Sequence, residues 1–517
     1  MSWGPEVEDI VRRRELGGQM GGPELIAQHH ADGKLTVRER IDLLIDADSF
    51  REQGRLAGVG VYENGRLEKF FPSGVVVGTA HIDGRRVIVT GSDFTARRAP
   101  EVTGRQRNKG TYAAEMALEM KVPFVHLIDA FGASIRGVAT MGRTYIPEMR
   151  DYWMIHEMLG EVPVVAAALG SVAGGPAAHA AATHFTVMVR GTSQVFAAGP
   201  PVVQRALGRE ITKEELGGSQ VHARGSGLAD NEAESEEDAL QQVRQFLSYL
   251  PSNVYTIPPV SPCSDASDRQ DEELISLIPR DRRRPYDTRK MLAHIADKGS
   301  VFEMGRYYGG SVVTAFGRLD GHPVGMIAND PRVLGGSMDA AAAEKFAKFV
   351  DLCDTFHVPL ANFVDQPGFM IGPGAEQAGT LKKGVRALAA IYDSSIPWAT
   401  IIVRRVYGVA GAAHQSHRRH SFRMAWPSAE WGSIPIEGGV AAAYRRQIED
   451  APNPDVERKR IEDEMIESRN PLKTAEAFDI ENLIDPRETR PILVEWIHDA
   501  YERLPLQVGK KQHHMRP

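Results

Sequence analysis

Short apolar runs rich in β-branched residues alternate with amphipathic stretches through most of this 517-residue chain. In the first half we expect a strand pair, a helix, a strand, a helix and a strand at 75–90, 104–120, 122–129, 145–160 and 163–170. In the second half the same order is predicted at 311–328, 338–354, 359–365, 378–393 and 398–406. Strand and helix periodicities that alternate in this way are typical of an α/β fold built from βαβ-like units.

The segments outside this alternation have different patterns. Residues 1–70 predict a charged, largely helical entry segment, with an amphipathic helix at 34–44. Three prolines between 253 and 264, followed by an acidic run at 265–273, indicate an interdomain linker. The closely spaced charges at 455–469 favour an exposed helix.

The two halves also repeat each other in sequence. Val75-Val76 ahead of Asp83-Gly84 recurs as Val312-Val313 ahead of Asp320-Gly321, so that both pairs are offset by 237 (312 − 75 and 320 − 83). The apolar run 122–129 recurs at 358–365, at an offset of 236 (358 − 122). A repeat of this length is far longer than a solenoid unit and indicates a duplicated domain. We therefore predict two domains, 1–260 and 261–517.

Two short stretches within the repeat are the candidate sites. Residues 172–176 (VAGGP) resemble 409–413 (VAGAA), and neither stretch offers an acid, a base or a nucleophile. Each follows a predicted buried strand and begins a helix, where backbone N–H groups are unpaired and the helix dipole favours negative charge. The pattern predicts two oxyanion holes, made by Gly174 and Gly175 and, in the repeat, by Gly411 and Ala412. The alternative is a strand-to-helix turn in which glycine only relieves steric strain; the recurrence favours the oxyanion holes.

Composition narrows the class of protein. A net charge of −7 argues against a general nucleic-acid or membrane binder, and no apolar run approaches the length of a membrane span. The N-terminus lacks the apolar core of a signal sequence. Two cysteines, Cys263 and Cys353, are too few for a disulfide scaffold or a cysteine zinc site, so a cytoplasmic protein is the simplest interpretation. Esterase-type nucleophile, phosphate-loop and zinc motifs are absent from the sequence.

Two further features have weaker interpretations. His414, His417 and His420 are spaced to line one face of a helix, and with Arg418 and Arg419 they favour a basic pocket or subunit contact over a metal site. Lys121 follows a methionine, as in biotin-acceptor sequences, but it lies between a predicted helix and strand. We predict no metal site and no modification of Lys121.

With these residues in view, the chain resembles a known family, the carboxyltransferase (β) subunits of biotin-dependent acyl-CoA carboxylases. The family includes the propionyl-CoA and 3-methylcrotonyl-CoA carboxylases. The resemblance covers residues from about 20 to beyond 445. In the first half it rests on 33–41 (GKLTVRERI), 91–95 (GSDFT), 173–175 (AGG), 198–203 (AGPPVV), 215–218 (ELGG), His222 and Ser226-Gly227. In the second half it rests on 284–287 (RPYD), 327–329 (IAN), 365–369 (DQPGF) and 425–430 (AWPSAE).

The resemblance implies two tandem crotonase-like domains, with active sites between the first domain of one subunit and the second domain of another in a homo-hexameric core. It implies that Gly174 and Gly175 hold the enolate oxygen of an acyl-CoA thioester and that the second turn holds the ureido oxygen of biotin. Carboxybiotin would arrive on a biotin carboxylase or carrier-protein partner, and biotin itself would remove the α-proton. The cofactor-binding residues implied near the turns are Ala173, Gly368, Phe369, Val409, Ala410 and His414.

The sequence departs from the family pattern at the second turn. The usual Tyr-Gly-Gly-Ala-Tyr-Asp reads here Tyr407-Gly408-Val409-Ala410, continuing to His414. Counting from Tyr407 assigns the N–H donors to Val409 and Ala410, whereas the internal repeat assigns them to Gly411 and Ala412, which we favour.

Three alternatives to a carboxylase subunit follow from the same sequence. One is a decarboxylase or transcarboxylase on the same fold, and a second is a non-catalytic assembly subunit. The third, an enoyl-CoA hydratase, would need carboxylates beside the first turn, and residues 170–182 contain none.

Overall fold

The computed structural model describes residues 2–96, 108–132, 142–144, 146, 152–420 and 422–516. The chain divides into two compact units. Unit 1 comprises Met1–Thr256 with His514–Pro517, and unit 2 comprises Ile257–His513. The predicted boundary after residue 260 lies close to this division.

Unit 1 is built on a seven-stranded sheet in the order β1-β4-β5-β6-β7-β9-β11. The strands are β1 (Arg51–Gln53), β4 (Val75–Ile82), β5 (Arg85–Ser92), β6 (Phe124–Ile128), β7 (Val164–Ala168), β9 (Phe185–Val189) and β11 (Asn231–Ala233). β1, β4 and β5 pair antiparallel, and the remaining pairs are parallel. All residues of β7 and β9 are buried, as expected for the centre of a parallel sheet covered on both faces.

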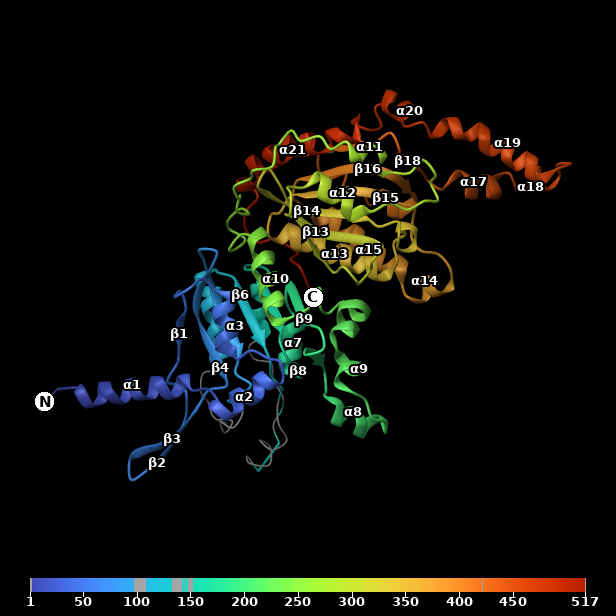
Figure 1. Cartoon of the computed structure of the whole chain (residues 1–517). Helices are drawn as coiled ribbons and strands as arrows, with labels where there is room; N and C mark the ends of the chain where they lie inside the picture. The colour runs from blue at the N-terminus through green and yellow to red at the C-terminus, as the bar shows by residue number, and fades with distance from the viewer. Residues whose placement is uncertain are drawn as a thin grey trace. The chain divides into compact units, whose positions relative to one another are not determined.

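Helices of unit 1 pack against this sheet and against one another. α3 (Val37–Leu44) and α10 (Glu236–Tyr249) lie side by side against it (Figure 1), while α4 (Lys109–Met120) packs against β4, β5 and α6 (Tyr152–Met158). The other described helices are α1 (Gly4–Gly18), α2 (Pro23–Ala31), α7 (Gly175–Ala181), α8 (Pro200–Leu207), α9 (Lys213–Gly217) and the π-helix Val221–Ser226.

Unit 2 repeats this sheet in the order β12-β13-β14-β15-β16-β17-β19. Its strands are β12 (Phe302–Met304), β13 (Val312–Leu319), β14 (His322–Asn329), β15 (Leu360–Gln366), β16 (Trp398–Tyr407), β17 (Arg423–Ala425) and β19 (Asn482–Leu483). β18 (Glu430–Gly432) pairs with the end of β16, where it matches the pairing of β8 (Ser171–Ala173) with β10 (Gln194–Phe196) in unit 1.

The helices of unit 2 fall into a group near the sheet and a C-terminal group. Near the sheet are α11 (Glu273–Leu277), α12 (Thr288–Ile295), α13 (Ala340–Thr355), α14 (Pro373–Gln377), α15 (Thr380–Asp393), α16 (Gly408–Ala412) and α21 (Thr489–Arg503). The others are α17 (Ile436–Ala443), α18 (Arg445–Glu449), α19 (Pro454–Ile466) and α20 (Pro471–Glu476). α19 lies within the predicted charged helix and buries mainly Ile461. The largest buried side chain of the core is Trp426.

The predicted duplication is confirmed in register. The hairpin β4–β5 and the hairpin β13–β14 have the same strand lengths and start at Val75 and Val312, which keeps the offset of 237. The expected helices at 338–354 and 378–393 correspond to α13 and α15. Of the helices expected at 104–120 and 145–160, α4 and α6 are the described parts; 101–107, 145 and 147–151 lie outside the described residues.

One expectation for the entry segment was wrong. Besides helices, residues 1–70 contain most of a hairpin, β2 (Gly58–Glu63) and β3 (Arg66–Pro72), joined by Asn64 and Gly65. Both turn residues have positive φ, 48° and 78°. Asn-Gly is a favoured pair for such a two-residue turn, so local turn chemistry decides this segment.

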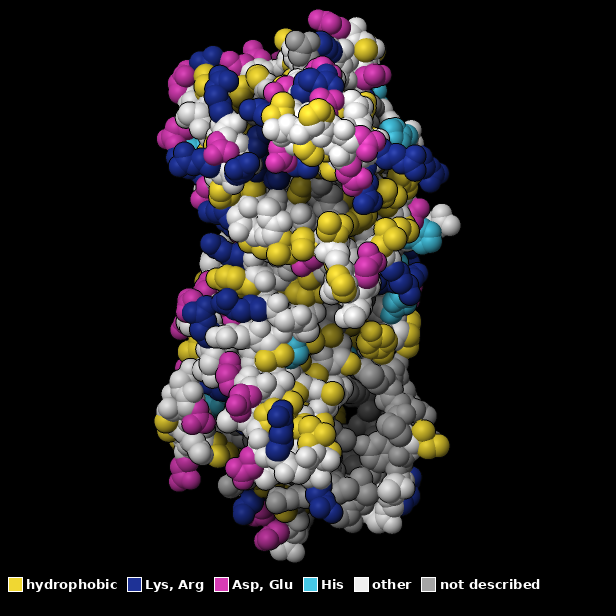
Figure 2. All heavy atoms as spheres, turned by 90° about the vertical axis from the view of Figure 1, so that its right-hand side faces the viewer, with side chains coloured by type: hydrophobic (Ala, Val, Ile, Leu, Met, Phe, Trp, Pro, Cys, Tyr) yellow, Lys and Arg dark blue, Asp and Glu magenta, His cyan; other side chains and the backbone are white. Residues whose placement is uncertain are grey.

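Basic and acidic side chains are interspersed over the described part of the face drawn in Figure 2. Within the ranges described above, no helix has the length and apolar character needed to cross a membrane.

Candidate active site

The first glycine turn ends a buried strand of unit 1. β7 is followed by β8 and then by α7, whose first residue is Gly175. Gly174, just before the helix, has φ 69° and ψ −129°, a conformation that side chains disfavour. Gly174 and Gly175 are both exposed, and no atom lies within 4 Å of a Cβ built on Gly175. The backbone here is therefore open to a ligand.

The N–H groups of this turn differ in their partners. Gly174 N–H donates to the Phe196 carbonyl at 3.4 Å, and the carbonyl of Gly174 accepts from Ala177 and Ala178. Pro176 has no N–H. Among the described residues, the Gly175 N–H has no hydrogen-bond acceptor. An exposed, unpaired N–H at the first turn of a helix is a donor for a negatively charged oxygen.

The second turn has the same architecture in unit 2. β16 begins at Trp398 and β7 at Val164, an offset of 234 (398 − 164), and residues 405–407 of β16 pair with β18 as β8 pairs with β10. Gly408 follows with φ 63° and opens α16. Gly408 and Val409 therefore stand where Gly174 and Gly175 stand in unit 1. Both are exposed, Val409 to 58%.

The favoured placement of the second pair of donors at Gly411 and Ala412 does not match this topology. Gly411 is buried, and a Cβ there would lie 2.8 Å from the Val406 carbonyl carbon, so this glycine permits close helix–strand packing. Gly411 and Ala412 end α16, where helical N–H groups point at carbonyls of the preceding turn. The offset falls from 237 to 234 because the segments before and after β15 are shorter than their unit 1 counterparts. The sequence similarity at VAGGP and VAGAA is therefore out of register with the fold.

Four of the sequence-predicted cofactor-binding positions lie together in unit 2. Phe369, Ala410 and His414 line one cavity of about 20 Å³, and Gly368 precedes Phe369 with φ 129°. The Gly368 N–H is held by the Gln366 side chain at 2.9 Å. Ala173 lies in unit 1, next to Gly174.

His414 is a structural residue of this loop. Its Nδ1 bonds the Gly411 carbonyl at 2.9 Å, and its own carbonyl accepts from Asn362 and Trp398 at 3.1 and 3.0 Å. Burial lowers the pKa of His414 to about 4, so the imidazole is neutral at pH 7 with Nδ1 as the donor. Its Nε2 is buried without a partner among the described residues.

The expected basic helix face at residues 414–420 is not formed. α16 ends at Ala412, and turns and bends follow, with His417 and His420 exposed. Helical spacing therefore does not apply to these histidines.

A buried aspartate lies near each glycine turn, and the sequence interpretation missed its importance. Asp365, at the end of β15, is 0% exposed and accepts two hydrogen bonds from Arg404, at 2.8 and 3.0 Å, and three from Arg405, at 2.7, 3.2 and 3.2 Å. Its counterpart Asp129 is 1% exposed and lies 3.3 Å from Lys34 and 3.5 Å from Arg40. The signal was available, since both residues end the apolar run repeated at an offset of 236.

Arg40 connects the first aspartate to the backbone before the glycine turn. It forms two hydrogen bonds with Glu236, at 2.7 and 2.6 Å, and donates to the carbonyl of Leu169 at 3.0 Å. Burial raises the pKa of Glu236, partly offset by Arg40. This network fixes the strand end from which the glycine turn departs.

Comparisons with known proteins identify the family of the chain. Residues 28–515 match the carboxyl transferase domain family. The chain is 36% identical over 517 residues to the propionyl-CoA carboxylase carboxyltransferase subunit of Haloferax mediterranei, covering 99% of each protein. It is 34% identical over 480 residues to the methylmalonyl-CoA decarboxylase subunit alpha of Veillonella parvula, covering 92% of this chain and 91% of the relative.

Solved structures show the same relationship. The crystal structure of transcarboxylase 12S, described as a hexamer with methylmalonyl-coenzyme A and methylmalonic acid bound, superimposes with a TM-score of 0.86 at 30% identity. The match covers 100% of this chain and 98% of that one. The crotonase-like fold expected for both domains is thereby confirmed. The chain belongs to the carboxyl transferase family and is a carboxyltransferase of the biotin-dependent acyl-CoA carboxylases.

Proposed function

We propose that this chain moves a carboxyl group from carboxybiotin, held on a partner carrier protein, to the α-carbon of an acyl-CoA. The observation that carries the proposal is the exposed N–H of Gly175 at the start of α7, which has no acceptor among the residues that the structure describes, in a chain that matches carboxyltransferases along nearly its whole length.

The first turn stabilises the acyl-CoA as it becomes an enolate. When the α-proton leaves, negative charge moves to the thioester oxygen, and the Gly175 N–H donates to it. Gly174 keeps the approach clear, because its positive φ turns the backbone without a side chain. Such a donor contributes about 3–4 kcal/mol when it acts mainly on charge that develops in the transition state.

The second turn provides the matching contact for biotin. Gly408 and Val409 occupy the first turn of α16, where N–H groups lack intrahelical acceptors, and both are exposed. These residues fit a ureido oxygen for the same reason that Gly174 and Gly175 fit a thioester oxygen. This assignment replaces Gly411 and Ala412 as donors.

The segment that contains the first turn, residues 170–182, carries no carboxylate, and the nearby Asp129 is buried and paired with Lys34 and Arg40. Carboxybiotin supplies both the carboxyl group and, after releasing it, the base for the α-proton. What this chain contributes is orientation and charge stabilisation by backbone amides, with Asp129 and Asp365 holding the strand ends in place.

We further propose a homo-hexameric core in which the two turns of one active site come from different copies of the chain. The support is the transcarboxylase 12S structure, which is described as a hexamer forming a multienzyme core. A biotin carboxylase and a biotin carboxyl carrier protein are the expected partners. Two free cysteines, Cys263 and Cys353, support a cytoplasmic setting.

The second candidate function is decarboxylation or transcarboxylation at the same site. It is favoured by the 34% identity to a methylmalonyl-CoA decarboxylase subunit and by the transcarboxylase match. In that case the same two amide turns act in the reverse direction, with the partner proteins setting the direction.

The deciding experiment is carboxylation of an acyl-CoA panel by the chain with biotin carboxylase, biotinylated carrier, ATP and labelled bicarbonate. Incorporation of label into at least one acyl-CoA supports the proposal. Decarboxylation of the matching carboxyacyl-CoA without any forward incorporation would favour the second candidate. Failure of both reactions would contradict the catalytic assignment and favour a non-catalytic assembly subunit.

A further inference from the structure

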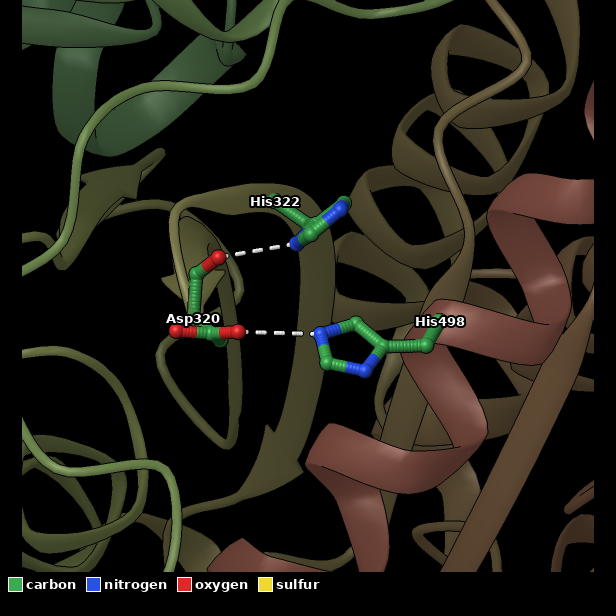
Figure 3. A group of neighbouring side chains, drawn as sticks. All are labelled: Asp320, His322 and His498. Atoms are coloured by element: carbon green, nitrogen blue, oxygen red, sulfur yellow. Dashed lines mark hydrogen bonds and ion pairs between the residues drawn. The ribbon is translucent and has the colours of Figure 1, made fainter.

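Three side chains at one edge of unit 2 form a set of metal-ligand groups. Asp320 lies in the tight turn between β13 and β14, His322 is the first residue of β14, and His498 lies on α21 (Figure 3). Donor atoms of the three side chains all lie within 4.8 Å of one another. Asp320 and His322 are half-buried, and His498 is exposed.

The existing contacts already hold two of the three groups in place. Oδ2 of Asp320 lies 3.0 Å from Nε2 of His498. Nδ1 of His322 lies 2.8 Å from the backbone carbonyl of Asp320. Nδ1 is the ring nitrogen of His322 on the side of Asp320 and His498, whereas Nε2 points away from them (Figure 3), so His322 binds an ion here through Nδ1 once its bond to the Asp320 carbonyl is released. The two imidazole rings meet edge to face, with centroids 5.0 Å apart and an interplanar angle of 61°.

Ion binding requires two local adjustments, release of the His322 Nδ1 bond to the Asp320 carbonyl and closure of the widest ligand separation. Ligands bound to one Zn²⁺ at about 2.0–2.2 Å stand roughly 3.3 Å apart in a tetrahedron. The Asp320–His498 pair already has this separation, so the wider separation has to close by roughly 1.5 Å. His498 is 46% exposed in its side chain and has room to rotate.

The duplicated hairpin of unit 1 has different side chains at the matching positions. The turn Asp83-Gly84 matches Asp320-Gly321, and its two amides are held by Asp46, as those of the second turn are held by Asp297. Arg85 replaces His322 and donates to the Leu250 carbonyl at 2.5 Å.

The charge on the turn differs between the units. In unit 1, Arg244 of α10 forms an ion pair with Asp83. In unit 2, Asp320 pairs with His498, which lies on α21, the helix that follows the last strand. Where unit 1 presents a permanent cation to the turn carboxylate, unit 2 presents two imidazoles.

We propose that Asp320, His322 and His498 bind one divalent transition-metal ion of the Zn²⁺ type. Two imidazoles and one carboxylate suit Zn²⁺ or Co²⁺, whereas Mg²⁺ and Ca²⁺ prefer oxygen ligands. Water completes the coordination, since the site is open to solvent. The ion supplies the positive charge that Arg244 supplies in unit 1, and it links the β13–β14 hairpin to α21. Binding to the folded state alone stabilises that packing by mass action.

The test uses the full-length chain, stripped of metal with a chelator and titrated with Zn²⁺ by calorimetry, with Co²⁺ absorption as a second probe. We expect one ion per chain that is lost or weakened at least about tenfold in His322→Gln and in His498→Gln. Zn²⁺ at roughly a hundredfold excess over Kd should raise Tm by about 4 °C or more in the unsubstituted chain and less in both variants.

The matched control is His30→Gln. His30 lies 3.0 Å from Glu39 in unit 1, so it is an exposed histidine–carboxylate pair outside the three-residue cluster. Zn²⁺ stoichiometry should be unchanged by this substitution. Asp320→Asn, which preserves the size of the turn side chain, serves if either histidine variant is misfolded by circular dichroism.

Two results would overturn the proposal. One is Zn²⁺ binding of equal stoichiometry and affinity in the chain and its His322→Gln and His498→Gln variants, as expected if other histidines such as His513 and His514 bound the ion. The other is no saturable Zn²⁺ or Co²⁺ binding by the folded, unsubstituted chain. Neither readout depends on carboxyl transfer.

Discussion

The two units place a buried aspartate at the end of the same strand and supply its positive partner from different places. In unit 2, Asp365 of β15 is paired with Arg404 on the neighbouring strand β16. In unit 1, the position matching Arg404 is Gly170. The Asp129 carboxylate occupies that space, since a Cβ on Gly170 would collide with its Oδ1. The guanidinium comes instead from Arg40 on α3.

This difference distinguishes the features that both units share from those that differ between them. Both units retain the buried strand, the carboxylate and a glycine with φ near 65° before the helix. The charge partner has moved between a strand and a helix without altering these features. The backbone turn is thus the common functional element, and the ion pairs are alternative supports for it.

The strongest test of the shared backbone element is Gly175→Pro. Proline removes the N–H while fitting the first turn of a helix, so the fold should survive. We expect kcat/KM for acyl-CoA carboxylation to fall by about 10²–10³, as for loss of one oxyanion donor.

The control for this prediction is Gly175→Ala, which keeps the N–H and adds a Cβ with no atom within 4 Å. It should retain activity within about threefold. Equal activity of Gly175→Pro and Gly175→Ala would remove the first turn from the mechanism.

The equivalence of the two turns is tested by Val409→Pro. If Val409 matches Gly175, deleting its N–H should lower carboxyl transfer by about 10², chiefly in the step that uses carboxybiotin. Val409→Ala keeps the N–H and trims an exposed side chain, so it should be nearly neutral in single-turnover transfer from carboxybiotinylated carrier.

If Val409→Pro retains full activity, Gly411 and Ala412 become the better candidates for the backbone N–H donors of the second turn. An independent check is Gly411→Ala, whose added Cβ meets Val406 at 2.8 Å. It should destabilise unit 2 by about 1–3 kcal/mol through overpacking.

The two placements of the second turn show how much of the fold and site the sequence can predict. Periodicity and the repeated hairpin sequences predicted β4–β5 and β13–β14 correctly, because a Val-Val strand start and an Asp-Gly turn are local signals. For the second turn, the similarity of VAGGP and VAGAA predicts donors at Gly411 and Ala412, whereas strand pairing aligns Gly174 with Gly408 and supports the proposed donors at Gly408 and Val409. Pairing between strands is non-local and leaves no mark in a single sequence.

The charge partners show a second limit. The recurrence of Asp129 and Asp365 was visible, but nothing local indicates that Arg40, which lies far earlier in the chain, reaches Asp129. The Asn64-Gly65 hairpin is the opposite case, since the turn pair that forms it is a local signal in the sequence. The sequence thus predicted elements and their duplication, while contacts between distant segments required the fold.

The difference in ion pairing predicts unequal costs for the same substitution. Asp365→Asn leaves Arg404, which is 3% exposed, without its carboxylate, so it should destabilise unit 2 by about 3–5 kcal/mol. Asp129→Asn should destabilise unit 1 by only about 1–3 kcal/mol. Oδ1 of Asp129 has no partner among the described residues, and Arg40 keeps Glu236.

Hydrogen exchange of the β15 and β6 amides measures the two effects separately. Asp393→Asn, an exposed substitution in unit 2, should change protection there by less than about 0.5 kcal/mol. If Asp365→Asn and Asp129→Asn lower the free energy of unfolding by the same amount, the two carboxylates are equally supported, and the proposed difference between the units is wrong.

A second matched pair, Lys109 and Lys345, tests the comparison through pH. Each lysine donates to a glycine with positive φ that follows the first strand of its sheet, Gly54 at 3.2 Å and Gly305 at 2.9 Å. Lys345 is 8% exposed, and burial lowers its pKa to about 7, whereas Lys109 is less buried. Burial also lowers the pKa of Lys109.

Between pH 7 and the unfolded lysine value of about 10.4, the unfolded chain keeps a proton that folded Lys345 has released. The free energy of unfolding of unit 2 should therefore rise with pH, by about 2 kcal/mol from pH 7 to pH 9. Lys345→Met should remove this part of the slope, and Lys109→Met should change the slope of unit 1 less. Denaturant unfolding across this range, followed by tryptophan fluorescence in a variant with Trp3 and Trp153 of unit 1 replaced by Phe, measures it, because the remaining tryptophans all lie in unit 2. An unchanged slope in Lys345→Met would mean that Lys345 stays charged when folded and that the two lysines are equivalent after all.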